Sequence, residues 1–326
     1  MTESIVAQGD GIYTIDTGFM RPGLVASHLL RAGDEAVLID VGVARSAPVL
    51  LQALRNLALP LENIKAVIVT HVHLDHAGGA GVLLSHLPEA RLIVHPRGAR
   101  HMIDPARLNA SATSVYGEQT MHTLFGELKP VPAERVVIAE DGFRYSFSQR
   151  ELQFIDTPGH ARHHLCVIDR TSRSLFTGDA FGLSYRCFDS NHGEHIVPTT
   201  TPTQFDPDAY HRTIDRILAC APRQLFLAHF GRLVDVERAA TRLHREIDYY
   251  VDCAQKAGVL PGDRLQQLTQ LLFARLVDSL REQRCTLGEA EIHELMQMDM
   301  NLNAQGLLHW FDRRFDRPQR DSKKET

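Results

Sequence analysis

The sequence predicts an α+β fold in which two β-sheets pack face to face under outer helices, with a helical extension at the C-terminal end. Short apolar runs separated by Gly, Pro and Asp turns recur up to about residue 233, and few helical segments interrupt them. Beyond that point no strand-like run remains, and apolar residues follow helical spacing. We therefore divide the chain into a catalytic-type unit, 1–233, and a helical unit, 234–326.

The individual elements of the first unit follow from apolar content and turn residues. Ten segments have the character of strands: 12–17, 24–30, 36–39, 66–70, 92–95, 136–138, 152–155, 165–168, 175–177 and 225–228. Four segments have the spacing of helices: 46–57, 78–87, 96–101 and 207–219. Strands far outnumber helices, which favours sheets in the centre and helices outside.

Amphipathic stripes dominate the second unit. Behind the start signal Pro-Gly-Asp at 261–263 follow Leu265, Leu268, Leu272, Leu276 and Leu280. A capping box is predicted at Thr286 and Glu289, and a further apolar face consists of Leu307, Leu308, Phe311 and Phe315. We expect these stripes to form core or a docking surface, through which an oligomer could assemble. Residues 317–326 are expected to form a solvated tail.

Composition excludes several classes of protein. The chain has 326 residues, 44% hydrophobic and 23% charged, with a net charge of −5, so it has no overall positive field to attract nucleic acid or an anionic membrane. We expect no nucleic-acid or membrane partner. No apolar run has the length of a signal peptide core or a transmembrane helix, and the five cysteines form no CxxC pair. These features predict a cytoplasmic protein with reduced thiols.

One loop concentrates potential metal ligands. The apolar run 66–69 continues into THVHLDHAGG at 70–79, which contains His71, His73, Asp75 and His76. Side chains alternate along an extended segment, so His71 and His73 point the same way. Asp75 and His76 lie beyond the turn, at the start of a helix, and can face a second position. This loop can therefore serve two adjacent cations.

Three further strands each end in a nitrogen or oxygen ligand. The run 154–156 leads through Thr-Pro-Gly to His160, the run 175–177 leads through a glycine to Asp179, and 225–228 ends at His229. A histidine or aspartate at several strand ends is a pattern typical of a metal site assembled at one edge of a fold. We expect all three side chains to join the His-rich loop.

These motifs, together with LIDVG at 38–42, resemble the metallo-β-lactamase superfamily over roughly residues 10–233. The resemblance implies an αββα sandwich with two metal ions. It further implies that His71, His73 and His160 hold the first metal, that Asp75, His76 and His229 hold the second, and that Asp179 bridges them. Asp40 is implied to support the metal loop rather than to bind metal.

The ligand types restrict the metal and its chemistry. Imidazoles and carboxylates without thiolate suit Zn²⁺, Fe²⁺ or Mn²⁺, and we take zinc as the expected ion. Two such ions would share a water whose pKa falls to about 7, so that hydroxide could attack a carbonyl of a small-molecule substrate. Their positive charge would favour an anionic tetrahedral intermediate. Asp75 is either a ligand only or also a proton shuttle to the leaving group.

Substrate contacts are expected from two loops beside the strand ends, 104–126 and 180–206. The second loop holds a mixed aromatic and polar set that we take as candidates: Tyr185, Arg186, Phe188, Asn191, His192 and His195. His163 and His164 lie just after His160, and we expect them to orient neighbours rather than bind metal.

Within the superfamily, TPGH at 157–160, Asp179 and the helical C-terminal unit resemble the glyoxalase II-like branch, including bacterial members such as the Pseudomonas quinolone signal response protein. The resemblance predicts a carboxylic ester or thioester hydrolase, with lactones as a close variant. Two alternatives stay open. One is a phosphodiesterase or nuclease of the same fold, and the other is a regulatory protein that binds a partner through its C-terminal helices, with hydrolysis secondary.

Overall fold

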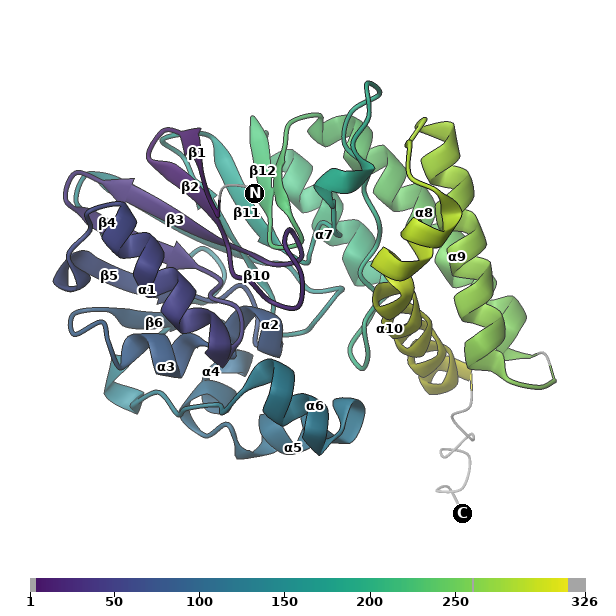
Figure 1. Cartoon of the computed structure of the whole chain (residues 1–326), viewed down its shortest axis with the longest axis horizontal. Helices are drawn as coiled ribbons and strands as arrows, with labels where there is room; N and C mark the ends of the chain where they lie inside the picture. The colour runs from purple at the N-terminus through teal and green to yellow at the C-terminus, as the bar shows by residue number, and fades with distance from the viewer. Residues whose placement is uncertain (1–3, 260, 316–326) are drawn as a thin grey trace, which may run out of the picture.

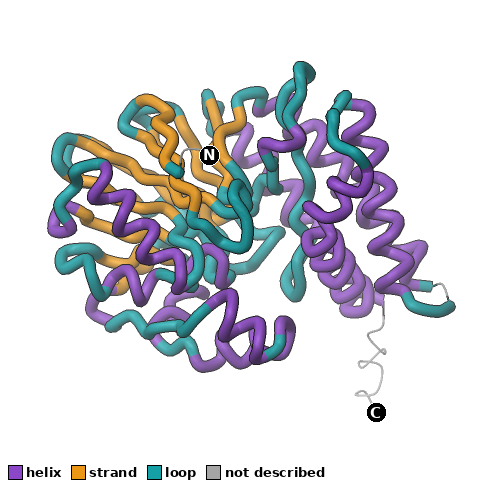
Figure 2. The backbone as a smooth tube through the Cα atoms, viewed as in Figure 1, coloured by secondary structure: helices purple, strands orange, loops and turns teal. Residues whose placement is uncertain are grey.

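The computed structural model describes residues 4–259 and 261–315. Two β-sheets face each other, helices cover their outer faces, and a helical region follows at the C-terminal end (Figures 1 and 2). The predicted α+β fold with αββα layers and a C-terminal helical extension is confirmed. The tail predicted at 317–326 lies outside the described residues.

The first sheet contains seven strands in chain order. They are β1 Ile5–Gly9, β2 Ile12–Asp16, β3 Ala26–Ala32, β4 Glu35–Ile39, β5 Ile64–Ile68, β6 Arg91–Val94 and β7 Val136–Ile138. The strands β1 to β4 pair antiparallel, whereas β4 to β7 run parallel. Parallel strands end at the same edge of a sheet, so the residues that follow β4 and β5 meet there.

The second sheet contains six strands in the reverse order, from β13 to β8. They are β8 Arg144–Phe147, β9 Arg150–Asp156, β10 Leu165–Asp169, β11 Ser174–Gly178, β12 Gln224–Leu227 and β13 Gly231–Leu233. β10 is antiparallel to both β9 and β11, and β11 is parallel to β12. The strands β9, β11 and β12 therefore point the same way, and the residues that follow them reach one edge.

The helices have the following bounds. They are η1 Ala44–Ser46, α1 Ala47–Asn56, η2 Leu61–Asn63, α2 Leu74–Ala77, α3 Ala80–Leu84, α4 Pro96–Ile103, α5 Ala106–Tyr116, α6 Glu118–Thr120, η3 Met121–Phe125, η4 Ala133–Arg135, η5 Arg186–Phe188, α7 Pro207–Ala219, α8 Val236–Gly258, α9 Arg264–Glu282 and α10 Glu289–Phe315. The helices predicted at 46–57, 96–101 and 207–219 are confirmed as α1, α4 and α7. Within the described residues, no helix is long and apolar enough to cross a membrane.

Three predictions of local structure differ from the structure. The helix expected over 78–87 is present only as the shorter α3, and α2 ends before that range; a Cβ on Gly79, which lies between the two helices, would be 2.7 Å from the Val43 carbonyl oxygen. The loop expected at 104–126 is largely helical. The capping box is displaced, because α10 begins at Glu289 and the Gly288 amide donates to the Glu291 carboxylate at 2.9 Å.

The hydrophobic core extends without interruption into the C-terminal helices. Phe154, Phe176 and Phe226 fill the space between the two sheets. On the outer face of the second sheet, Leu225 belongs to the same buried cluster as Leu272 of α9, and the cluster also includes residues of α7, α8 and α10. The predicted Leu stripe of α9 is buried from position 268 to position 280. The C-terminal helices therefore continue the core that the second sheet and α7 form, with α8 packed against α7.

Candidate metal centre

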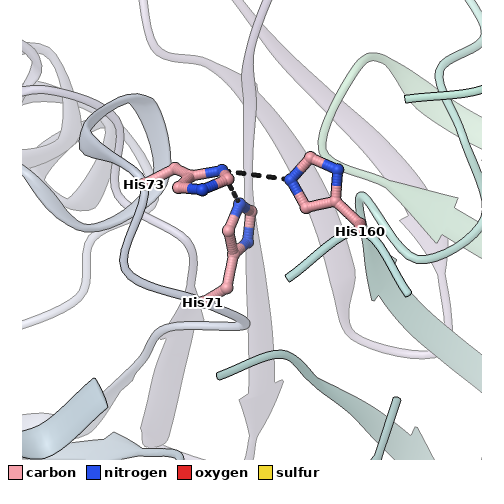
Figure 3. A group of neighbouring side chains, drawn as sticks. All are labelled: His71, His73 and His160. Atoms are coloured by element: carbon pink, nitrogen blue, oxygen red, sulfur yellow. Dashed lines mark hydrogen bonds between the residues drawn. The ribbon is translucent and has the colours of Figure 1, made fainter. Parts of the chain in front are cut away.

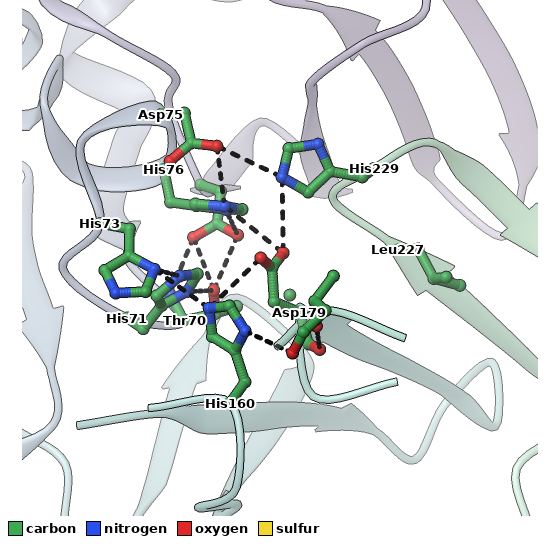
Figure 4. Close-up of polar contacts among 12 residues, drawn as sticks. Thr70, His71, His73, Asp75, His76, His160, Asp179, Leu227 and His229 are labelled. Atoms are coloured by element: carbon green, nitrogen blue, oxygen red, sulfur yellow. Dashed lines mark hydrogen bonds and ion pairs between the residues drawn. The ribbon is translucent and has the colours of Figure 1, made fainter. Parts of the chain in front are cut away.

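Seven side chains converge where the strands of both sheets end (Figure 4). They are His71, His73, Asp75, His76, His160, Asp179 and His229. The loop after β5 and helix α2 supply the first four, and the segments after β9, β11 and β12 supply one each. The structure therefore brings together every residue that the sequence predicted for the centre.

The first group consists of three histidine rings whose nitrogens face one another (Figure 3). His73 Nδ1 lies 2.9 Å from His71 Nε2 and 3.0 Å from His160 Nε2. Burial, and next the neighbouring His160, lowers the pKa of His73 to about 3, and burial likewise lowers the pKa of His160 to about 3. Neutral imidazoles with converging lone pairs are the form in which histidine binds a metal.

The second group combines carboxylates and histidines. Asp75 Oδ2 lies 3.4 Å from His76 Nε2 and 3.3 Å from His229 Nε2. Asp179 spans both groups, because its Oδ1 lies 3.4 Å from His76 Nε2 and its Oδ2 lies 3.4 Å from His160 Nε2. A carboxylate in this position can bridge two cations, as the sequence resemblance implies.

Unpaired atoms show that these residues fit divalent metal ions. Among the described residues, His76 Nε2 and Asp179 Oδ1 are buried without a hydrogen-bond partner, although buried polar atoms are nearly always paired. Burial lowers the pKa of His229, but Asp179 and Asp75 outweigh it and raise the pKa to about 9. The carboxylates thus attract positive charge to this point. Nitrogen and oxygen donors without thiolate suit zinc, iron or manganese.

Hydrogen bonds behind the ligands hold the rings in place. Asp40 accepts from the Thr70 amide and hydroxyl, each at 2.8 Å, and lies 3.2 Å from His76 Nδ1. Two ligands make contacts with backbone carbonyls, His160 Nδ1 with Thr199 at 3.1 Å and His229 Nδ1 with Leu24 at 2.9 Å. Each contact leaves the opposite ring nitrogen free to face the site.

The two histidines that follow His160 have supporting positions. His164 Nε2 accepts from the Asp179 amide at 3.2 Å, and its Nδ1 lies 2.9 Å from the Thr157 hydroxyl. His163 Nδ1 accepts from the Val72 amide at 3.4 Å. Both rings therefore contact the segments that carry the candidate ligands, as expected from the sequence.

The 180–206 segment does line the cavity beside the centre, through Leu183, Thr199, Thr201, Pro202, Thr203 and Gln204. The six residues that the sequence singled out in this segment do not, which corrects that part of the expectation. Tyr185, Phe188 and His195 are buried, and His195 Nδ1 lies 3.0 Å from Gln283 Oε1 after α9. Arg186 donates to the Arg232 carbonyl at 3.0 Å. Asn191 and His192 also lie outside the cavity wall. The segment packs against C-terminal helices that the sequence did not place beside it.

A cavity of about 240 Å³ opens beside the candidate ligands, with Asp75, Asp179 and His229 in its wall. Apolar side chains form much of the remaining wall. They are Phe19, Leu24, Val72, Leu74, Leu108, Ala112, Val115, Phe125, Leu183, Met298 and Leu302. Helix α5 lies within the predicted 104–126 segment, whereas the contribution of α10 was not predicted. The cavity therefore suits a largely apolar group held close to the metal ligands.

The αββα layers and the His/Asp cluster at the strand ends define a metal-binding sandwich protein. The sequence model of the metallo-beta-lactamase superfamily matches residues 20–222, and the chain belongs to that superfamily.

Three relatives share between 26% and 31% of their aligned residues with this chain. The metallo-beta-lactamase fold-containing protein ST1585 of Sulfurisphaera tokodaii is 26% identical over 257 residues, covering 76% of this chain and 90% of the relative. Acyl-coenzyme A thioesterase MBLAC2 of Gallus gallus is 31% identical over 182 residues, covering 52% of this chain and 63% of the relative. Atrochrysone carboxyl ACP thioesterase of Aspergillus fumigatus is 28% identical over 156 residues, covering 47% of this chain and 38% of the relative.

Solved structures support the same fold along most of the chain. TTHA1429 of Thermus thermophilus, a metallo-beta-lactamase family protein, superimposes with a TM-score of 0.65 at 20% identity, covering 94% of this chain and 95% of that one. ST1585 superimposes with a TM-score of 0.63 at 22% identity, covering 91% and 98%. At such identities the likeness concerns the fold alone.

Proposed function

We propose that this protein is a dinuclear metal-dependent hydrolase that cleaves small-molecule carboxylic thioesters or esters, with lactones as a close variant. The observation that carries the proposal is the set of seven candidate ligands in and beside the wall of a largely apolar cavity. An acyl group in that cavity would place its carbonyl next to the ligand cluster. Zinc is the ion we expect, with iron and manganese as alternatives.

The ligand assignment follows the two groups of side chains. His71, His73 and His160 would hold one ion and Asp75, His76 and His229 the other, with Asp179 between them. When bound, such a pair of divalent ions supplies hydroxide near neutral pH and polarises a carbonyl oxygen.

The chain's own groups orient the substrate and move the proton. Asp75 lines the cavity with its side chain 26% exposed, so a leaving group can reach it. We therefore keep Asp75 as the candidate proton shuttle as well as a ligand. The apolar wall, for example Leu108 and Leu302, excludes water from the acyl group and orients it.

Relatives favour thioesters among the candidate substrates. Two of the matched proteins are named thioesterases, one acting on acyl-coenzyme A and one on an acyl carrier protein. The matched region spans 63% of the acyl-coenzyme A thioesterase and 38% of the acyl carrier protein thioesterase. Because each match covers less than two thirds of the relative, thioesters as the substrate class are part of our proposal. The finer resemblance to the glyoxalase II-like branch also stays a prediction.

The alternative functions receive less support. A phosphodiesterase or nuclease would need a basic surface, whereas the chain carries a net charge of −5. A regulatory role through the C-terminal helices, or an oligomer formed by them, is not needed to explain their apolar stripes, because these stripes are buried in a cluster that the second sheet shares. We propose a small-molecule substrate, with no nucleic acid and no membrane as partner.

A hydrolysis screen of the metal-loaded protein tests the proposal. The panel contains acyl-coenzyme A thioesters, simple esters, lactones and phosphodiesters, each at several chain lengths. We expect thioesters to be cleaved with the highest kcat/KM and the His73→Ala variant to lose the activity. Preferential cleavage of phosphodiesters, or a thioesterase activity that His73→Ala retains in full, would contradict the assignment.

A further inference from the structure

Helix α10 supplies part of the cavity wall, and its residues lie outside the segment 20–222 that the family model covers. Met298 and Leu302 are apolar, and Asp299 and Asn303 are polar. Asn303 has its amide group engaged, because Oδ1 accepts from the Thr200 amide at 2.6 Å and Nδ2 donates to the Pro198 carbonyl at 3.0 Å. It anchors the neighbouring segment rather than facing a ligand.

Asp299 has an unpaired oxygen. Its Oδ1 accepts from the Tyr185 hydroxyl at 3.2 Å, but its Oδ2 is buried without a hydrogen-bond partner among the residues the structure describes. The nearby Arg21 does not supply the missing partner. Its Cζ lies 4.6 Å from the centroid of the Tyr185 ring, and its positive charge favours the ionised Asp299 carboxylate, but no hydrogen bond from Arg21 reaches Asp299 Oδ2.

The unpaired carboxylate oxygen of Asp299 is suited to a ligand group that donates a hydrogen bond. Burial raises the pKa of Asp299 to about 6, so the side chain is ionised at pH 8 and can only accept hydrogen bonds. Met298 and Leu302 beside it offer no donor. Because a buried acceptor without a donor is unfavourable, a ligand bearing N–H or O–H at this position is favoured over an apolar one.

The charges along the cavity indicate which part of the substrate meets Asp299. Arg107 of α5 and His101 of α4 also line the cavity, and α5 lies apart from α10 in the fold (Figure 1). A phosphate-bearing thiol leaving group is attracted by the Arg107 guanidinium and repelled by the Asp299 carboxylate, whereas burial and the neighbouring Arg100 lower the pKa of His101 and favour its neutral form. The acyl group, not the leaving group, therefore lies against α10.

We propose that Asp299 is a specificity-determining residue that selects acyl groups carrying a hydroxyl or amino donor, through its free carboxylate oxygen. This inference rests on the proposed thioesterase function, since it assigns the acyl half of the same substrate. It explains why a charged side chain of α10 lies in the cavity wall between the buried residues Met296 and Asn303.

The test compares matched thioesters at pH 8 with the full-length, metal-loaded protein. The substrates are hexanoyl-, 3-hydroxyhexanoyl- and 3-aminohexanoyl-coenzyme A, with the corresponding octanoyl set to vary the donor's reach. We expect kcat/KM for at least one donor-bearing thioester to exceed that of its unsubstituted partner by about tenfold or more. The isosteric Asp299→Asn variant, which removes the charge and replaces one acceptor by a donor, should abolish that preference.

The exposed carboxylate Asp278 of α9 provides the control, because Asp278→Asn should leave the preference unchanged. Equal kcat/KM for substituted and plain thioesters in the wild-type protein, or the same preference in Asp299→Asn, would overturn the inference. If no thioester is cleaved, the proposed function fails separately. Calorimetric binding of hexanoate and 3-hydroxyhexanoate to wild type and Asp299→Asn then decides the role of Asp299, with tighter binding of the hydroxy acid lost in the variant if the inference holds.

Discussion

The ligand cluster and the cavity wall are built by different means. The ligands stand on short segments directly after strands, and hydrogen bonds such as those of Asp40 to Thr70 fix these segments to the sheet. Much of the wall comes from helices, from α5 at 106–116 and from α10 near the C-terminal end. The candidate metal ligands thus come from local segments at strand ends, whereas the cavity wall beside them depends on helices brought in by distant packing.

Removal of the C-terminal helices should have the largest effect. Deleting 234–326 removes α8, α9 and α10 from the hydrophobic cluster that they share with the second sheet and exposes the apolar surface that packs against α8, besides removing the α10 wall. We expect little or no soluble folded protein, as measured by gel filtration and circular dichroism. Removing only 317–326 is the control and should leave the melting temperature unchanged. A soluble, fully active chain ending at 233 would show that the wall is dispensable.

Substitution of a ligand should separate function from stability. His76 has a buried, unpaired Nε2, so His76→Ala should lower turnover at least about a hundredfold and reduce metal content, with a smaller effect on folding. The matched variant His86→Ala removes an exposed histidine from the segment that follows the same loop and should be nearly silent. Equal losses in both variants at unchanged metal content would end the residue-by-residue assignment.

Metal affinity should rise with pH. In the metal-free chain the carboxylates raise the pKa of His229 to about 9 and the pKa of His76 well above its ordinary value, despite burial. Each ring must lose its proton before it can bind a metal, so protons compete below those pKa values. Between pH 6 and 8 the affinity should increase by about tenfold per pH unit for each proton released. Titration with Zn²⁺ in buffers of different pH checks this, and a flat profile would contradict it.

Substitution of Asp40, which supports the candidate ligands, should weaken metal binding less than substitution of a candidate ligand. Asp40→Asn keeps the shape of the side chain, and asparagine tolerates the φ of 51° found there. Loss of the charge that faces His76 Nδ1 should weaken metal binding about 10- to 100-fold. Competition with a chelator measures this, and Asp34→Asn, at an exposed position, is the control. Equal affinity in Asp40→Asn and wild type would show that Asp40 supports the fold alone.

The contrast between local segments and distant helices also explains what could be predicted from the sequence. The convergence of the seven candidate ligands was predictable because each follows an apolar run with a turn, a pattern readable over a few residues. The surroundings of the 180–206 segment were not, because Tyr185 contacts Asp299 of α10 and His195 contacts Gln283, which lie 114 and 88 residues further along the chain. Asp299 did leave a signal, a carboxylate between buried positions of a helix, but only the packing of α10 shows that it lines the cavity.

Helix α5 was not predicted from the sequence, because the helix shows little apolar periodicity. Ala112 is its only buried residue among those the structure describes in that helix, so it shows little of the apolar periodicity by which a helix is predicted. Leu108 and Tyr116 line the cavity. Residues that face a cavity rather than the core thus weaken the apolar periodicity that would reveal their secondary structure.

Metal content per chain tests the central claim most directly. The full-length protein, purified without chelators, is analysed by elemental mass spectrometry beside its Asp179→Ala variant. The account predicts close to two divalent ions per chain in the wild type, with zinc as the expected element, and a substantial loss of the second ion in Asp179→Ala, because that carboxylate lies between the two groups. A correctly folded wild-type protein with no bound metal, or with one ion that Asp179→Ala leaves unaffected, would contradict the dinuclear centre.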